Sequence, residues 1–193
     1  AASAITFGTA GVIAGMDNER VVQLPHLDGT GMKSEVIMQN AHQIGYAHAI
    51  RNTGAKIIYV DTRKELEKAI NKNTAMMFFL NANNGRGEIK HEEWIEVAKK
   101  YDIPTMNDCA ADVPPVENLW KYTQMGFDLV CFSGGKGIRG PQSAGLLLGK
   151  KNLIQAARLH APPRGNTVGR GMKVNKEEIL GMMVALEVYV NKD

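Results

Sequence analysis

The chain has 193 residues, 44% hydrophobic and 22% charged, which is the composition of a folded globular domain rather than of a disordered segment. No apolar run approaches the ~18 residues of a membrane span, so we expect no membrane partner. The net charge of +3 is modest, and the two cysteines belong to no CxxC or His/Cys cluster, which argues against a metal site.

Apolar runs alternate with segments of helical periodicity along the chain. In chain order the pattern predicts helix Ala2–Ala14, strand Val36–Gln39, helix Gly45–Asn52, strand Lys56–Val60, helix Lys64–Ile70, strand Met76–Leu80, helix His91–Tyr101, strand Thr105–Asp108, helix Leu119–Met125, strands Leu129–Phe132 and Ala144–Leu148, and helices Lys151–Leu159 and Lys176–Val190. Strands separated by helices predict an α/β fold of three αβα layers around a mostly parallel sheet.

Four polar residues fall at or just after the ends of predicted strands. They are His42, Asn81, Asp108 and Ser133. Ligands of such sheets bind at the carboxyl ends of the strands, so we expect these side chains to share one cleft. Lys136 follows Ser133 in the same loop and should join them.

Lys136 lies in a Ser-Gly-Gly-Lys-Gly turn at the end of an apolar strand. We expect the glycines to clear space around the amine and to allow unusual backbone angles. An amine in this position suits the carbonyl of a cofactor, with which it would form a Schiff base, or a phosphate. A phosphate-binding or surface lysine remains an alternative, although the Walker A spacing is absent.

Asp108 closes its strand, where a buried carboxylate suits the protonated nitrogen of a pyridine ring. A helix N-cap or loop aspartate is the alternative. His42 is a candidate to stack on such a ring or to transfer a proton, and a histidine packed in the core is its alternative. Together with Lys136, these residues indicate pyridoxal phosphate (PLP) as the cofactor.

Further polar groups are candidates to bind the same cofactor. The Ser133 hydroxyl and the N–H groups of Ala1 and Ala2, at the start of the first helix, suit its phosphate. Asn81 could contact the ring oxygen, or could serve only in a turn.

Charge is unevenly distributed along the chain. The stretch from Leu129 to Lys176 contains nine lysines and arginines and no aspartate or glutamate. This asymmetry favours an anionic ligand, such as a phosphorylated metabolite, a cofactor phosphate or RNA, although a solvated basic surface is the alternative.

The first residues resemble the opening turn of a helix without its preceding cap. We therefore expect the chain to be the central part of a larger protein. Cys109 and Cys131 lie in or beside predicted core strands, where we expect buried free thiols, as in a cytoplasmic protein.

Several segments resemble the selenocysteine-synthase-like branch of the aspartate aminotransferase fold superfamily. The run Phe132–Gly145 resembles its lysine motif, in which Ser-Gly-Asp/Gly-Lys leads into Gly-Pro-Gln-x-Gly. The run Asn107–Pro115 is similar to the Asp-Ala-Ala-Ala…Pro-Pro segment of its metabolic members, and Arg170–Lys176 to its basic segment. The opening Ala1–Ala4 looks like the tail of its Ser-Gly-Ala-Ala phosphate turn.

Within this branch, Gly29–Val36 and His42–Ile50 look closer to the D-glucosaminate-6-phosphate ammonia-lyase type than to the seryl-tRNA selenium transferases. The transferases prefer Ser-Gly-Asp-Lys where this chain has Gly135. They also prefer Asp-x-Gly-Ser where it has Asp108–Ala111. Both departures argue against a tRNA partner.

The resemblance implies the large, cofactor-binding domain of a fold type I PLP enzyme over residues 1–193, without the N-terminal arm and C-terminal small domain. It also implies a homodimer or larger homo-oligomer, which the cysteine usage would place in the cytoplasm. The expected reaction is loss of water and ammonia from a phosphorylated, sugar-derived 2-amino acid, with Lys136 and Asp108 as catalytic residues. Arg139, Arg170 and Lys173 are candidates to hold this small anionic substrate. A seryl-tRNA selenium transferase-like activity and a non-catalytic cofactor-binding fragment are the alternatives.

Overall fold

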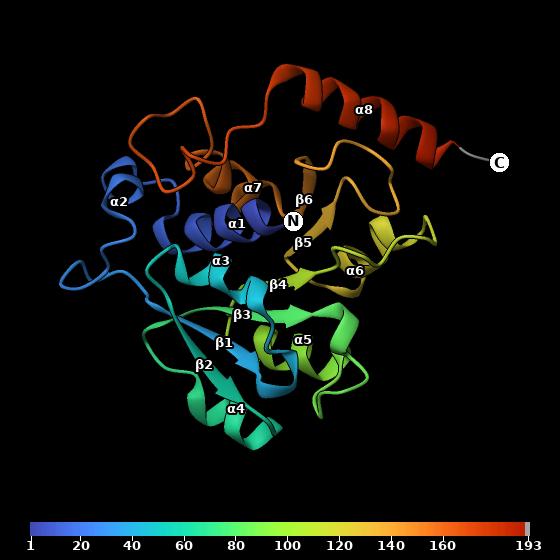
Figure 1. Ribbon diagram of the computed structural model, residues 1–193. Coiled ribbons are helices and arrows are strands. Elements are labelled where there is room, and N and C mark those ends of the chain that lie inside the picture. The colour runs from blue at the N-terminus through green and yellow to red at the C-terminus, as the bar shows by residue number, and fades with distance from the viewer. Residues whose placement is uncertain (192–193) are drawn as a thin grey trace.

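The computed structural model describes residues 1–191, which form a six-stranded sheet in the order β2-β1-β3-β4-β5-β6 (Figure 1). The strands are β1 Glu35–Gln39, β2 Lys56–Val60, β3 Thr74–Leu80, β4 Thr105–Asp108, β5 Leu129–Ser133 and β6 Gly145–Gly149. All neighbouring pairs are parallel except β5 with β6. This confirms the predicted α/β fold with a mostly parallel sheet.

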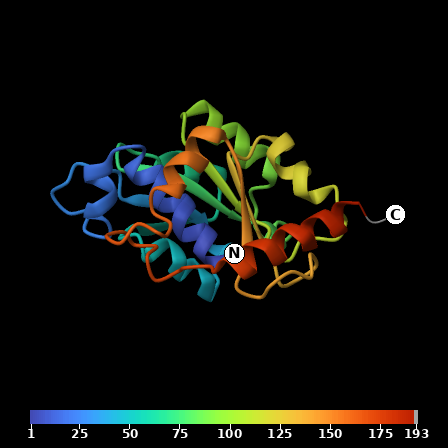
Figure 2. The same cartoon turned by 90° about the horizontal axis from the view of Figure 1, so that it is seen from above.

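Helices cover both faces of the sheet. They are α1 Ala2–Ala14, α2 Asn18–Gln23, α3 His48–Arg51, α4 Arg63–Ala69, α5 His91–Lys100, α6 Asn118–Met125, α7 Lys151–Arg158 and α8 Lys176–Val190. The view from above shows α1 and α3 on one side of the sheet and α5 and α6 on the other (Figure 2). Helix α7 packs on α1, where a Cβ on Gly11 would lie only 2.5 Å from the Ala157 backbone nitrogen. Glycine at this position therefore lets the two helices approach closely.

The sheet separates two hydrophobic cores, and β3 shows how one strand supplies both. Its side chains alternate, so that Met76 and Phe78 belong to the core under α1 and α3, whereas Met77 and Phe79 belong to the core under α4, α5 and α6. All of β3 is buried, as the period of two requires for a central strand covered on both faces.

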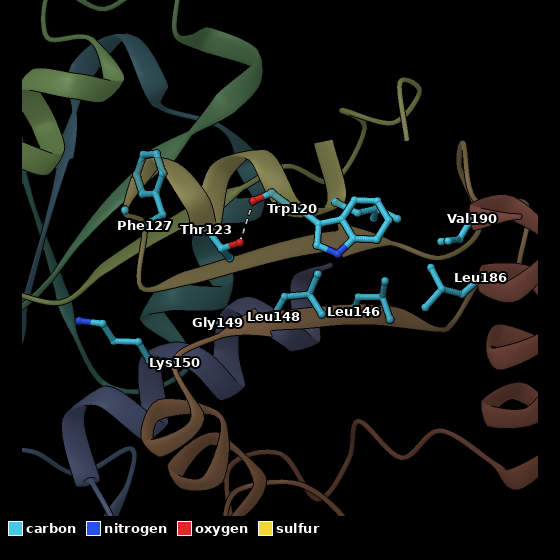
Figure 3. A pocket seen from close by; sticks show the side chains of 11 residues that line it. Trp120, Thr123, Phe127, Leu146, Leu148, Gly149, Lys150, Leu186 and Val190 are labelled. Carbon is cyan, nitrogen blue, oxygen red and sulfur yellow. Dashed lines mark hydrogen bonds between the residues drawn. The ribbon is translucent and has the colours of Figure 1, made fainter. Parts of the chain in front are cut away.

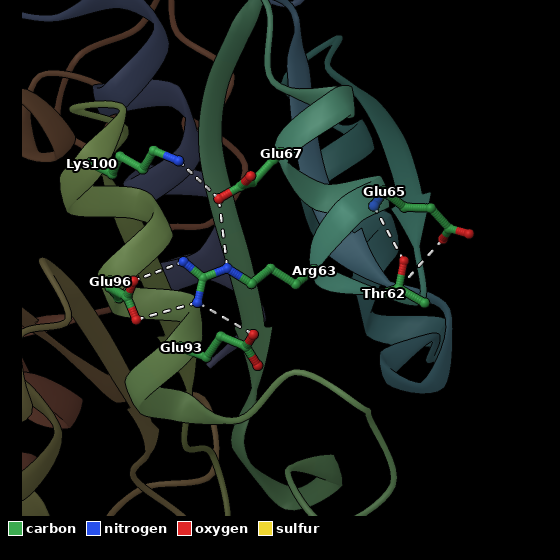
Figure 4. A network of polar contacts seen from close by, with 7 residues as sticks. All are labelled: Thr62, Arg63, Glu65, Glu67, Glu93, Glu96 and Lys100. Atoms are coloured by element: carbon green, nitrogen blue, oxygen red, sulfur yellow. Dashed lines mark hydrogen bonds and ion pairs between the residues drawn. The ribbon is translucent and has the colours of Figure 1, made fainter.

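A polar network joins α4 to α5 on the surface (Figure 4). The Arg63 guanidinium donates to Glu96 at 2.7 Å and approaches Glu93 and Glu67 at 3.5 and 3.6 Å. Lys100 pairs with Glu67 at 3.1 Å. These contacts fix the two helices side by side.

The helix expected at Gly45–Asn52 is divided: a 3-10 turn, η2 (Gly45–Ala47), precedes the short α3. Two further turns, η1 (Asn40–His42) and η3 (Asn81–Asn83), follow β1 and β3. The chain passes from β1 outward to β2 and returns to β3 on the other side of β1, so its direction across the sheet reverses there. Crevices for ligands form at such reversals. Within residues 1–191, none of the helices has the length and apolarity needed to cross a bilayer.

Candidate active site

The loop between β5 and β6 carries Lys136. It is closed at its base because Ser133 pairs with Gly145 in the antiparallel register of the two strands. The Gly134 N–H then donates to the Ala144 carbonyl at 2.9 Å. This hairpin brings the loop back to the edge of the sheet at which β5 ends.

Close packing explains the loop's glycines better than open space does. A Cβ on Gly137 would lie 2.0 Å from the Val113 carbonyl oxygen, and one on Gly135 would lie 2.5 Å from the Gln142 side chain. Neither glycine has a positive φ; within the loop that conformation belongs to Arg139, at 60°. The expectation of unusual glycine angles was therefore wrong, and the glycines instead let the loop pack against the segment after β4.

Lys136 and Asp108 line one pocket of about 420 Å³. The pocket lies where the segments after β1, β3 and β4 meet the lysine loop, as the reversal of strand order predicts. Its lining is Ile44, Gly45, Tyr46, Leu80, Ala82, Asn83, Asp108, Ala110, Ala111, Asp112 and Lys136. The Lys136 side chain is exposed, so its amine can reach a ligand in this pocket.

Asp108 is the last residue of β4 and is only 3% exposed. Its Oδ1 accepts the Ala110 N–H at 3.1 Å and the Cys131 thiol at 3.5 Å. Burial raises the pKa of Asp108, while these two donors and the Lys136 amine oppose the rise. The structure therefore places an acceptor carboxyl in the same pocket as the amine.

A second carboxyl, Asp112, lines the pocket four residues later. It is half-buried, and burial raises its pKa, whereas Asn81 and the Lys136 charge act in the opposite direction. Asp112 belongs to the Asn107–Pro115 segment that the sequence singles out, but its position after the strand gave no sign of which way its side chain would point.

Tyr46 is the aromatic residue in the lining, and its side chain is 68% exposed. It also lines a second pocket of about 240 Å³, which Ala2, Ser3 and His48 share. Ala2 and Ser3 form the first turn of α1, whose N-cap, Ala1, makes no side-chain cap hydrogen bond. The two pockets thus connect the amine loop with a helix N-terminus, which favours an anion.

His42 lies outside this lining, because η1 turns its ring into the protein. It is fully buried, packs edge-on against Phe79 with ring centroids 4.4 Å apart, and its Nδ1 accepts the Leu80 N–H at 3.3 Å. Burial lowers the pKa of His42 to about 4. The structure therefore gives His42 the surroundings of a neutral core histidine and puts Tyr46 at the pocket.

Asn81 and Ser133 flank the pocket without lining it. The Asn81 amide donates to the Tyr122 hydroxyl at 2.9 Å and accepts from Asn107 at 3.2 Å. Its neighbour Asn83 lines the pocket instead. Ser133 is half-buried at the end of β5, with its backbone N–H on the Ala110 carbonyl at 3.3 Å.

The three basic residues expected to bind substrate are exposed and line neither pocket. Arg139 lies in the lysine loop, and Arg170 and Lys173 lie in the segment before α8. Met172, between the latter two, lines the second pocket. The chain path therefore brings this basic segment near the start of α1.

A larger pocket of about 530 Å³ lies between α6, β6 and α8 (Figure 3). Trp120, Leu146, Leu148 and Leu186 make it mainly apolar. Its titratable group, Lys150, is already paired with Asp128 at 2.6 Å. This pocket lacks the chemical groups of the Lys136 pocket, so its size does not make it the active site.

Comparison with known proteins identifies relatives over the whole chain. Residues 47–193 match the family model described as L-seryl-tRNA selenium transferase. D-glucosaminate-6-phosphate ammonia lyase from Salmonella typhimurium is 32% identical over 98% of this chain and 51% of its own length. The chain thus spans about half the length of this curated relative.

Solved structures agree with the fold. A structure of D-glucosaminate-6-phosphate ammonia-lyase superposes with a TM-score of 0.86, covering 100% of this chain and 52% of that one at 32% identity. A structure of SPT with PLP superposes with a TM-score of 0.65 at 14% identity, over 98% of this chain and 46% of that one. These matches confirm the fold of PLP-dependent transferases.

Proposed function

The chain belongs to the L-seryl-tRNA selenium transferase family, and from this membership we propose that residues 1–193 are the cofactor-binding domain of a PLP-dependent lyase. The substrate is a phosphorylated, sugar-derived 2-amino acid with a hydroxyl at C3. The net reaction removes that hydroxyl and the amino group, giving a 2-oxo acid and ammonia. The 32% identity to an ammonia lyase supports this reaction class.

The observation that carries the proposal is that Lys136 and Asp108 line one pocket. The donor set fits PLP: an accessible amine for an aldehyde, a buried carboxyl for a pyridinium nitrogen, and a helix N-terminus for a phosphate. Both hydrogen bonds of the Asp108 carboxyl are made by Oδ1, so Oδ2 has no partner among the described residues and suits an additional donor.

Four groups of residues would hold the cofactor. Asp108 would pair with the ring nitrogen, the Lys136 amine would bind the aldehyde, and the N–H groups at Ala1 and Ala2 would hold the phosphate. Tyr46 would flank the ring, in the place that the sequence suggested for His42. When bound, PLP supplies an electron-withdrawing ring that stabilises negative charge at the α-carbon of an amino acid.

Proton transfers fall to the ionisable groups of the pocket. The Lys136 amine is the base that removes the proton from the substrate α-carbon. Asp112 lines the same pocket, and its raised pKa favours a carboxyl that can donate a proton to the departing hydroxyl. The two groups would thus act on neighbouring carbons of the substrate.

Arg139, Arg170 and Lys173 remain the proposed ligands of the substrate carboxylate and phosphate. Met172 in the lining of the second pocket supports this role for the segment before α8. Guanidinium groups bind both kinds of anion in a bidentate manner, which suits such a substrate.

A selenium transferase-like reaction on a seryl-tRNA is the second candidate, because the family model bears that description. The acid-free, basic stretch from Leu129 to Lys176 also favours a polyanion. Tight, salt-sensitive binding of tRNA to the purified protein would support this candidate, and its absence would favour the small substrate.

We further propose a homodimer or larger homo-oligomer in the cytoplasm. Support for assembly comes from α8, where Ile179, Leu180, Met183, Val184 and Val188 are each more than half exposed. The buried cysteines Cys109 and Cys131 are both free, which suits a reducing compartment. Light scattering of the purified protein would measure the assembly.

The test of the proposed function is an absorbance spectrum of the protein with PLP, for the wild type and Lys136→Ala. We expect a visible band in the wild type, fixed on Lys136 by borohydride reduction and located by peptide mapping. Release of ammonia and a 2-oxo acid from D-glucosaminate 6-phosphate then tests the substrate. No band, or a label on another lysine, would overturn the assignment, and a band without turnover would support a non-catalytic cofactor-binding domain.

A further inference from the structure

Asp108 and Cys131 are cross-strand partners. They stand opposite each other in the parallel register of β4 and β5, and both are almost completely buried. Cys131 packs in the core under α1, and Asp108, its partner in register, points toward the same face of the sheet. The thiol therefore meets the carboxyl from the side of the protein interior.

The two donors to Asp108 converge on one oxygen. The Cys131 Sγ lies 3.5 Å from Oδ1, and the Ala110 nitrogen lies 3.1 Å from the same atom. One donor comes from the neighbouring strand and the other from the turn after β4. Because Oδ1 is held from two directions, rotation of the carboxyl about its Cβ–Cγ bond would break both contacts.

The thiol is suited to donate rather than accept. Burial raises the pKa of Cys131 well above its usual value, so it keeps its proton at neutral pH. A donor to a carboxylate favours the charged form and so opposes the effect of burial on the pKa of Asp108.

We propose that Cys131 is a positioning residue: its S–H, together with the Ala110 N–H, holds Oδ1 of Asp108 so that Oδ2 is presented to the nitrogen of the bound ring. This inference rests on the proposed function, because it assumes that Asp108 receives the ring nitrogen. It assigns a role to a buried cysteine that makes no contact with the substrate.

The test compares Cys131→Ala and Cys131→Val, which both lack the donor, with Cys131→Ser, which restores one. Cys109→Ala is the matched control, since Cys109 is equally buried but has no hydrogen bond to Asp108. Charge-assisted hydrogen bonds of this kind predict that loss of the donor weakens PLP binding about tenfold, and that serine recovers most of it. Thermal unfolding identifies variants that fold.

A second readout does not depend on PLP. In cofactor-free protein, the carboxyl ¹³C signal of Asp108 should titrate at a higher pH in Cys131→Ala and Cys131→Val than in the wild type. In Cys109→Ala it should titrate at the same pH as in the wild type. If Cys131→Ala and Cys131→Val bind PLP as the wild type does, and their Asp108 carboxyl titrates at the same pH, the positioning role is wrong while the proposed function stands. A wild type that binds no PLP at Lys136 overturns the proposed function and this inference together.

Discussion

Thr105 and Asp128 join the starts of β4 and β5 by three hydrogen bonds. The Asp128 carboxylate accepts the Thr105 N–H at 2.7 Å and its hydroxyl at 2.9 Å, and the Asp128 N–H donates to the Thr105 hydroxyl oxygen at 3.0 Å. Both residues are buried. They hold the two strands whose opposite ends carry Asp108 and the lysine loop.

Asp128→Ala should therefore destabilise the whole domain. It leaves the N–H and hydroxyl of Thr105 without their acceptor, and we expect a loss of about 3 kcal/mol in the free energy of unfolding. Urea denaturation measures it. Lys150→Ala is the control, because the Lys150 side chain is 66% exposed and its ion pair with Asp128 should contribute less than about 1 kcal/mol. Equal losses in the two variants would contradict this account.

Stability should fall as the pH drops below about 6.5. Burial lowers the pKa values of His42 and His160 to about 4 each, and lowers that of His91 as well. Above pH 6.5 these rings are neutral in both states. Below pH 6.5 these histidines bind protons in the unfolded chain but stay neutral in the folded one, so the free energy of unfolding declines until the pH reaches about 4.

The lowering of the pKa to about 4 at His42 and at His160 corresponds, for each residue, to a loss of on the order of 3 kcal/mol in the free energy of unfolding as the pH falls from 6.5 to 4. Denaturant titrations between pH 7.5 and 5 would measure the slope. In His160→Leu, unfolding at acidic pH should bind about one proton fewer than in the wild type. His26→Gln, at an exposed position, is the matched control. An unchanged slope in His160→Leu would refute the assignment.

Gly137→Ala should displace the lysine loop. A Cβ at this position would collide with the Val113 carbonyl, which is backbone and cannot turn aside. We expect PLP affinity to fall by about 100-fold, because small misplacements of a reactive group have effects of this size. Gly171→Ala, where a Cβ would meet no atom within 4 Å, should bind PLP as the wild type does. Circular dichroism would show whether the fold is retained.

Tyr46 and His42 should respond differently to substitution. Tyr46→Ala removes an exposed aromatic wall of the pocket, so we expect about tenfold weaker PLP binding with little change in stability, and Tyr46→Phe should restore binding. His42→Ala opens a cavity beside Phe79 and should lower the free energy of unfolding by about 2–4 kcal/mol. The reverse pattern would return the aromatic role to His42.

The fold could be predicted largely from hydrophobic periodicity. Strands Lys56–Val60 and Thr105–Asp108 and the helices Ala2–Ala14 and Lys176–Val190 have the predicted bounds. In three of these four elements the residue that follows is polar or turn-forming: Gly15, Asp61 and Asn191. Helix α2 escaped prediction, since its six residues span too few turns for a period to show. Its signal was Asp17, whose side chain caps Glu19 and Arg20.

The residue types of the site could be predicted from the sequence, but not the directions in which the side chains point. Asp108 ends β4 and Lys136 follows the end of β5, and the parallel sheet brings the ends of neighbouring strands together. His42 and Tyr46 lie beyond β1 in consecutive 3-10 turns, where neither helical nor strand periodicity applies. Which ring turns inward there depends on contacts with Phe79 and Leu80, 37 or more residues later in the chain.

Because β5 and β6 pair as an antiparallel hairpin, the Lys136 loop can form from local contacts, whereas the rest of the site needs contacts between distant segments. Contacts that close the Lys136 loop join residues within about twenty positions of one another, so the loop can form as soon as its own hairpin does. Asp108 and Tyr46 reach the pocket only after distant segments have paired. The hairpin that carries the amine is therefore closed by local contacts, whereas its packing against Val113 and the other walls of the pocket depends on long-range ones. Damage to remote parts of the sheet should disturb the pocket's walls before it disturbs the hairpin.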